Sequence, residues 1–370
     1  MQDADADEQR RLKVVSALLN FMNGFADDMA FAQPATWLCP SLDHLCYGNR
    51  CDHLASVEMS YAAAKDRCER VGRKLDDMMA LPPFNIPRGK TARQSMLYLH
   101  LHGRGLDDSS MKHLALFLAS GALASCQKLF LSRNQIGDSG IEALAQACAG
   151  GAMAQCKLLD LSSNKIGDTG LEAFSGALAT GALAQCTRLD LAQNQIGDAG
   201  MIKFSEACAG GALAQCTGLS LGGNKLGDKG LETLCGALAR GALASVTILD
   251  LSSNKIGDTG MKAFSDACAT GAMAQLRQLK LDGNQIGDKG LEALSGALAT
   301  GAMANVTFLD LSVNQIGDNG MAAFAQAIKP TSEGGGGAME SLKELWVNDG
   351  HLEYPALKAA CLTRGIKLLA

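Results

Sequence analysis

The stretch CKLLDLSSNKIGDTGLEAFSG, residues 156–176, holds the pattern from which the architecture of this chain follows. Leu159 and Leu161 alternate with more variable neighbours, which predicts a short strand that points its leucines inward. Asn164 follows where the chain must turn, and its amide can bond backbone groups that a buried turn leaves unpaired. The stretch therefore predicts an inward-facing strand followed by a buried polar corner.

A helix is predicted after this corner. Asp168 stands at a position suited to a helix N-cap, and Leu171, Phe174 and Leu178 recur at helical spacing. We expect the helix to end near Gly181, where the chain returns towards the next strand. One strand and one helix form the unit.

The unit repeats every 30 residues, with no insertion or deletion between the seven asparagines. A fixed period of this length is typical of a solenoid, because one unit cannot bury its apolar face alone and must stack on its neighbours. The sequence predicts a curved α/β solenoid with parallel strands on the concave side and helices on the convex side. The asparagines of the structural ladder are Asn134, Asn164, Asn194, Asn224, Asn254, Asn284 and Asn314.

The same register extends beyond these seven units in both directions. Arg104 stands at the asparagine position of an earlier unit and Gly350 at that of a later one, and terminal units commonly depart from the consensus. We therefore expect nine units over residues 96–370, with a Gly-rich insertion at 331–337.

This pattern resembles the leucine-rich repeats of the ribonuclease-inhibitor type. Similar repeats occur in the Ran GTPase-activating protein and in the repeat regions of nucleotide-binding innate-immune (NLR) receptors. The resemblance covers the chain from Met96 to its end, and it implies a helical convex side. A shared fold does not by itself name a function.

Residues 1–95 do not repeat. Residues 1–81 contain two stretches of heptad spacing, which predict a helical region that can fold as an antiparallel hairpin. Residues 82–95 contain Pro82, Pro83 and Pro87 and are predicted to be a stiff linker. The helices can cover the open edge of the first repeat, or they can bind a partner helix.

Composition limits the partners and the compartment. A net charge of −5 argues against nucleic acid as a main partner, and no apolar run of 18 residues predicts a transmembrane segment. Valine or leucine replaces the cysteine at the first inward position of later units, so these thiols are interpreted as small buried hydrophobes. They favour a reducing, cytoplasmic location. Secretion is the alternative, because residues 14–25 form an apolar stretch after basic residues. The cysteines concerned are Cys126, Cys156, Cys186 and Cys216.

No cofactor or metal is predicted. The spacing of the N-terminal cysteines and histidines matches no compact zinc pattern. Gly89 and Lys90 resemble the end of a phosphate-binding loop, but Phe84 stands where the first glycine of that motif is needed. The residues considered for zinc are Cys39, His44, Cys46, Cys51 and His53.

Side chains that point outward from the strands are the candidate binding residues, because packing does not fix them. Phe130, Phe308 and Trp346 are expected to be exposed anchors ringed by charges, as in interface hot spots. The alternative is an unused face on which scattered apolar residues have no role. The predicted partner-binding residues are His100, Lys128, Phe130, Leu158, Asp160, Arg188, Asp190, Ile248, Asp250, Lys280, Phe308, Asp310 and Trp346.

The sequence therefore favours a non-enzymatic scaffold that binds a partner protein through its concave face. One alternative is a GTPase-activating protein of the Ran-activating type, which the stimulation of GTP hydrolysis would distinguish. Another is a structural subunit of a larger assembly. No set of nucleophile, base and stabilising donor stands apart from the repeating pattern, which argues against catalysis.

Overall fold

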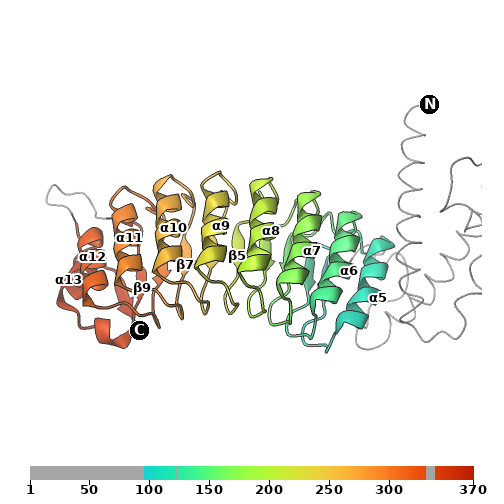
Figure 1. The fold of residues 1–370 in the computed structure, drawn as a ribbon, viewed down its shortest axis with the longest axis horizontal. Coiled ribbons are helices and arrows are strands. Elements are labelled where there is room, and N and C mark those ends of the chain that lie inside the picture. Colours follow the sequence, from blue (N-terminus) through green and yellow to red (C-terminus); the bar gives the residue numbers. More distant parts are fainter. Residues whose placement is uncertain (1–95, 122, 331–337) are drawn as a thin grey trace, which may run out of the picture.

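The computed structural model describes residues 96–121, 123–330 and 338–370. Strands and helices alternate along one curved stack, in which the helices lie side by side in chain order (Figure 1). This arrangement confirms the predicted α/β solenoid of parallel strands and helices. The predicted helical region, the linker and the Gly-rich insertion lie outside the described residues.

One parallel sheet of ten strands runs through the stack in chain order. Its last strand was not predicted, and it pairs Lys367 with Glu344 and Leu369 with Trp346. The strands are β1 (Tyr98–His100), β2 (Lys128–Phe130), β3 (Leu158–Asp160), β4 (Arg188–Asp190), β5 (Gly218–Ser220), β6 (Ile248–Asp250), β7 (Gln278–Lys280), β8 (Phe308–Asp310), β9 (Glu344–Trp346) and β10 (Lys367–Leu369).

The helices all lie on one side of this sheet. In the unit of residues 156–176 the helix begins at Asp168 and ends at Ala179, so its predicted extent is confirmed. The helices of the described residues are α5 (Asp108–Ala119), α6 (Asp138–Ala149), α7 (Asp168–Ala179), α8 (Asp198–Ala209), α9 (Asp228–Leu238), α10 (Asp258–Ala269), α11 (Asp288–Leu298), α12 (Asp318–Ile328) and α13 (Pro355–Arg364), with a 3₁₀ turn η1 (Asp349–His351).

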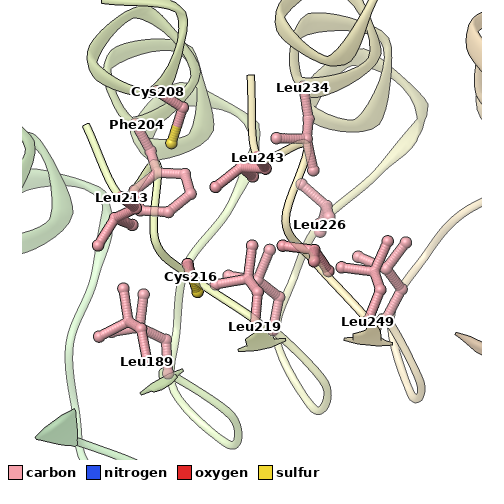
Figure 2. Close-up of a cluster of buried hydrophobic side chains, with 14 of the residues drawn as sticks. Leu189, Phe204, Cys208, Leu213, Cys216, Leu219, Leu226, Leu234, Leu243 and Leu249 are labelled. Carbon is pink, nitrogen blue, oxygen red and sulfur yellow. The ribbon is translucent and has the colours of Figure 1, made fainter. Parts of the chain in front are cut away.

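The core is the layer between the sheet and the helices. Leu219 points from the middle of β5 towards this layer, and Phe204 and Cys208 reach it from α8 (Figure 2). Cys216 lies among these leucines and is fully buried. Cys126, Cys156 and Cys186 are likewise at most 1% exposed, which confirms their interpretation as buried hydrophobes.

The buried asparagines join each unit to the one before it. Nδ2 of Asn224 donates to the carbonyl of Leu221 in its own unit and to that of Leu191 in the preceding one, both at 3.0 Å. Its Oδ1 accepts from the backbone N–H of Ile196 at 3.1 Å. One side chain therefore satisfies backbone groups on two units at a place that water does not reach.

The aspartates at the helix starts join the units in the opposite direction. Asp168 was predicted to cap its own helix, which is wrong: the N-cap of α7 is Gly167, and it makes no side-chain cap bond. Oδ1 of Asp168 instead accepts from the N–H of Gly197 at 2.6 Å and from that of Gly200 at 3.0 Å. The helices lie so close that a carboxylate at the start of one caps the next.

The ends of the stack use different residues for the same needs. At the start of α5, Asp107 is the N-cap and accepts from the N–H of Ser110 at 2.9 Å. At the far end, Asn348 donates from Nδ2 to the backbone carbonyl of Asn314 at 3.0 Å. The register of the repeats places the asparagine position at residue 350, which is a glycine. Asn348 lies two residues before it.

Removing one ladder asparagine should be costly. Asn224→Ala leaves buried backbone groups of two units unpaired, so we expect it to lower the free energy of unfolding by about 3 kcal/mol. Asn305→Ala is the control, because Asn305 is exposed and its Nδ2 donates to the carbonyl of Ala274 at 2.9 Å. Urea unfolding followed by circular dichroism compares the two variants. A similar loss in both would contradict the structural role of the ladder.

Two glycines of α11 should respond oppositely to alanine. A Cβ at Gly290 would lie 2.7 Å from Oδ1 of Asp258 and 3.0 Å from Cγ2 of Ile286, whereas one at Gly296 meets nothing within 4 Å. We expect Gly290→Ala to destabilise the fold by about 1–3 kcal/mol through overpacking. Gly296→Ala should stabilise it by about 0.5–1 kcal/mol. Urea unfolding gives both values, and two changes of the same sign would disprove the close helix contact.

Candidate protein-binding face

The outer face of the sheet is formed by the first and third residues of the strands, which flank the buried middle leucines. Parallel pairing aligns these residues in two columns, and all the predicted partner-binding residues lie in them. The first column is Tyr98, Lys128, Leu158, Arg188, Gly218, Ile248, Gln278, Phe308, Glu344 and Lys367. The second column is His100, Phe130, Asp160, Asp190, Ser220, Asp250, Lys280, Asp310, Trp346 and Leu369.

Aromatic and basic side chains pair with one another at the β1 end of this face. The rings of His100 and Phe130 stack with centroids 4.5 Å apart and planes 5° apart. Nζ of Lys128 lies 4.9 Å from the ring centroid of Tyr98, a cation–π geometry. Phe130 was expected to be exposed, but it is half-buried. Tyr98 was missed, although it lies one unit before Lys128 in the same register.

A short chain of hydrogen bonds borders this end. Nδ1 of His102 lies 2.9 Å from Oγ of Ser132, and this hydroxyl donates to Oδ2 of Asp160 at 2.7 Å. Because the serine has one proton and gives it to the carboxylate, Nδ1 of His102 must be the donor in the other bond. The serine lies between histidine and aspartate, which is not the order of a hydrolytic triad. The chain therefore orients Asp160 on the binding face.

Aspartates dominate the second column. In each, Oδ1 accepts from the N–H two residues later, at 3.0 Å, and this bond holds the carboxylate against the loop that follows the strand. A serine hydroxyl adds a second bond at three of these positions but not at Asp190, which is followed by Ala192. The four residues are Asp160, Asp190, Asp250 and Asp310.

Two carboxyl groups of this face have a raised pKa. Burial raises the pKa of Asp190, and the neighbouring carboxylates of Asp160 and Asp250 raise it further. Burial also raises the pKa of Asp282, with further contributions from Asp310 and Asp250. Asp282 follows β7 and was missed because it lies outside the strand pattern. Both carboxyl groups therefore lie where burial and neighbouring carboxylates disfavour the charged form.

Apolar and acidic side chains alternate at the other end. Phe308 is paired with Glu344, and Asp310 with Trp346, across β8 and β9. Phe308 and Trp346 were expected to be exposed, but both are half-buried. Nε1 of Trp346 is buried without a hydrogen-bond partner in the described structure. The following loop carries Val313, which is 72% exposed. Sequence reasoning missed this valine because its position resembles a simple spacer.

The described cysteines belong to the core. Burial raises the pKa of the Cys148 thiol and of the Cys268 thiol to about 12 in each case. Such thiols stay protonated at neutral pH, whereas the thiolate is the nucleophile. Among the described residues no group of three His, Cys, Asp or Glu side chains could hold a metal ion. The N-terminal cysteines and histidines considered for zinc, and the Gly89 segment, lie outside these residues.

None of the helices in the described ranges has the length and apolar character required to cross a membrane.

Comparisons with known proteins identify the repeat. The Leucine Rich repeat family matches seven segments of the chain, which is therefore a leucine-rich repeat protein. The segments are residues 127–145, 157–175, 187–205, 217–235, 242–265, 274–295 and 302–325. A solved internalin from Listeria monocytogenes is similar over 75% of this chain and 94% of its own, at 16% identity and a TM-score of 0.25. No curated protein matches the chain.

The raised pKa of Asp190 predicts how stability depends on pH. Ionised Asp190 destabilises the folded state above its folded pKa, and this cost disappears as pH falls through that pKa towards the unfolded value. Asp190→Asn keeps an acceptor for the N–H of Ala192, so we expect a thermal midpoint about 1–2 °C higher at pH 7. The gain should shrink on acidification towards pH 4.

The control for this prediction is Glu292→Gln on α11, which removes an exposed carboxylate from the convex side. Its thermal midpoint should stay close to that of the unchanged protein at every pH. Differential scanning calorimetry across this range measures both variants. An Asp190→Asn protein that is less stable at pH 7 would contradict the assignment.

Proposed function

We propose that this chain is a non-enzymatic scaffold that binds a partner protein through the concave face of its repeats. The observation that carries the proposal is a contrast within each strand. The middle residue is leucine in all ten strands, whereas the outer residues differ in charge, size and polarity from unit to unit. Packing accounts for the constant position, and a partner accounts for the varied ones.

The layout of the face supports recognition of a protein. Phe130, Phe308 and Trp346 offer large apolar surfaces beside charged groups, which is how binding hot spots are commonly built. The sheet also holds its outer side chains on a rigid support, so little conformational entropy is lost when they are bound. These features favour a flat or extended protein surface as the ligand.

We extend the proposal to the subtype and the compartment. One strand and one full helix in each 30-residue unit favour repeats of the ribonuclease-inhibitor type. Buried thiols at positions shared with valine and leucine favour a reducing, cytoplasmic location. Residues 1–81 are proposed to form the helical region and residues 82–95 the linker that precede the repeats at 96–370, with a partner helix as a further option for the first.

Affinity capture from native extract tests the scaffold. We expect the combined replacement of Phe130, Asp190 and Phe308 by alanine to leave the circular dichroism spectrum unchanged and to abolish capture of the partner. The control replaces Glu172, Ile202 and Glu292 by alanine. It should still capture the partner, since these exposed side chains lie on the helices α7, α8 and α11 and not on the concave face. An unchanged set of captured proteins in the concave variant would refute the proposal.

A further inference from the structure

One exposed side chain has a strained backbone. Val313 has a φ of 53°, in the left-handed region. The conformation belongs to this position of the repeat, where φ is 50–54° at Arg133, Ser163, Gln193 and Ser253 and 67° at Gly223 and Gly283. Glycine adopts it without a steric penalty. A β-branched residue there is an outlier, because its methyl groups crowd the backbone. Since Val313 is also 72% exposed, packing within the described structure does not offset this strain.

The turn requires this conformation in each of these units, and Val313 is the β-branched side chain among them. Packing does not explain that choice of residue, which points to a role in function. Val313 lies on the loop that follows β8, three residues after Asp310. Oγ of Ser312 in the same loop donates to Oδ1 of Asp310 at 2.6 Å, so the valine is tied closely to the binding face. It therefore adds an exposed apolar group to the loop at the Asp310 end of β8.

The same end of the face carries unbalanced negative charge. Among the outer residues of β6 to β9, Lys280 is the one cation, and its Nζ lies 3.9 Å from Oδ2 of Asp250. On the next strand, β10, Lys367 is paired with Glu344. With Asp250, the carboxylates of Asp310, Glu344 and the nearby Asp282 outnumber these two cations. Burial is the largest cause of the raised pKa of Asp282, and repulsion from the carboxylates of Asp310 and Asp250 raises it further.

We infer that the β6–β9 end of the concave face, together with Val313, binds a basic segment of a partner protein that carries apolar side chains between its lysines or arginines. This inference rests on the proposed function and names the chemistry of the partner. Opposite charge speeds encounter and selects the partner, while the apolar groups fill the spaces between the carboxylates. The β1 end is less suited to a basic segment, because its cation Lys128 and its ring His100 already contact aromatic side chains.

Two other occupants fit the charges poorly. A second copy of this chain, docked symmetrically, would bring the same carboxylates face to face, and like charges at an interface are repelled. A nucleic acid would bring phosphates to a surface that lacks the clustered lysines and arginines that bind them. A basic, partly apolar protein segment satisfies both the charge and the exposed apolar groups.

Three synthetic peptides of equal length serve as probes: one alternates lysine with leucine, one glutamate with leucine, and one lysine with serine. Fluorescence anisotropy with the full chain measures their binding. We expect the lysine–leucine peptide to bind at least about tenfold more tightly than either of the others, because it alone offers both kinds of contact. Equal binding of the glutamate–leucine peptide would overturn the inference.

Single variants locate the contact. Asp310→Asn and Val313→Gly should each weaken binding of the lysine–leucine peptide by about fivefold to tenfold. Val313→Gly should at the same time raise the thermal midpoint, because glycine releases the strain. Glu292→Gln removes the same charge from the convex side and should leave binding unchanged. An equal loss in this control would show general attraction to an acidic protein and would overturn the inference.

The capture experiment separates this inference from the proposed function. The variants Lys128→Ala and Phe130→Ala alter the β1 end, and Asp310→Asn with Val313→Gly alters the other end. If only the first pair abolishes capture of the native partner, the scaffold function stands and the basic-segment inference falls. If neither pair nor the combined concave variant affects capture, the proposed function itself fails.

Discussion

In the seven central units, the turn that leaves the sheet contains backbone groups that must be satisfied out of reach of water, and the buried asparagine amide meets that need. Because each amide bonds to two successive units, a turn is complete only when its neighbour is in place. This constraint fixes the register between strands. The register in turn aligns the outer side chains in columns, so the binding face is a consequence of the ladder behind it.

The sequence alone predicted the features that have a local period. Alternating leucines, helical spacing and the exchange of cysteine with valine each report packing directly, and the structure has them as expected. The partner of Asp168 could not be predicted, since an acidic residue at a helix start satisfies the local capping rule equally well. Only the stacking geometry shows that the carboxylate reaches the next helix.

Other features depended on side-chain conformations or lay outside the repeating pattern. The stacking of His100 on Phe130 and the burial of the Trp346 indole are set by rotamers, which sequence spacing does not specify. Asp282 and Val313 lie in loops, and β10 has no asparagine corner after it. The face that results has two unlike ends. At its β1 end, aromatic and cationic side chains contact one another. At its β6–β9 end, carboxylates outnumber cations and Val313 is exposed.

The two kinds of bond between units run in opposite directions along the chain. An asparagine reaches back to the preceding unit, and an aspartate caps the helix of the following one. A unit inserted between two others would therefore bring one of each and leave no donor or acceptor without a partner. The length of the molecule, and with it the reach of its binding surface, can change by whole units without any redesign of the joints.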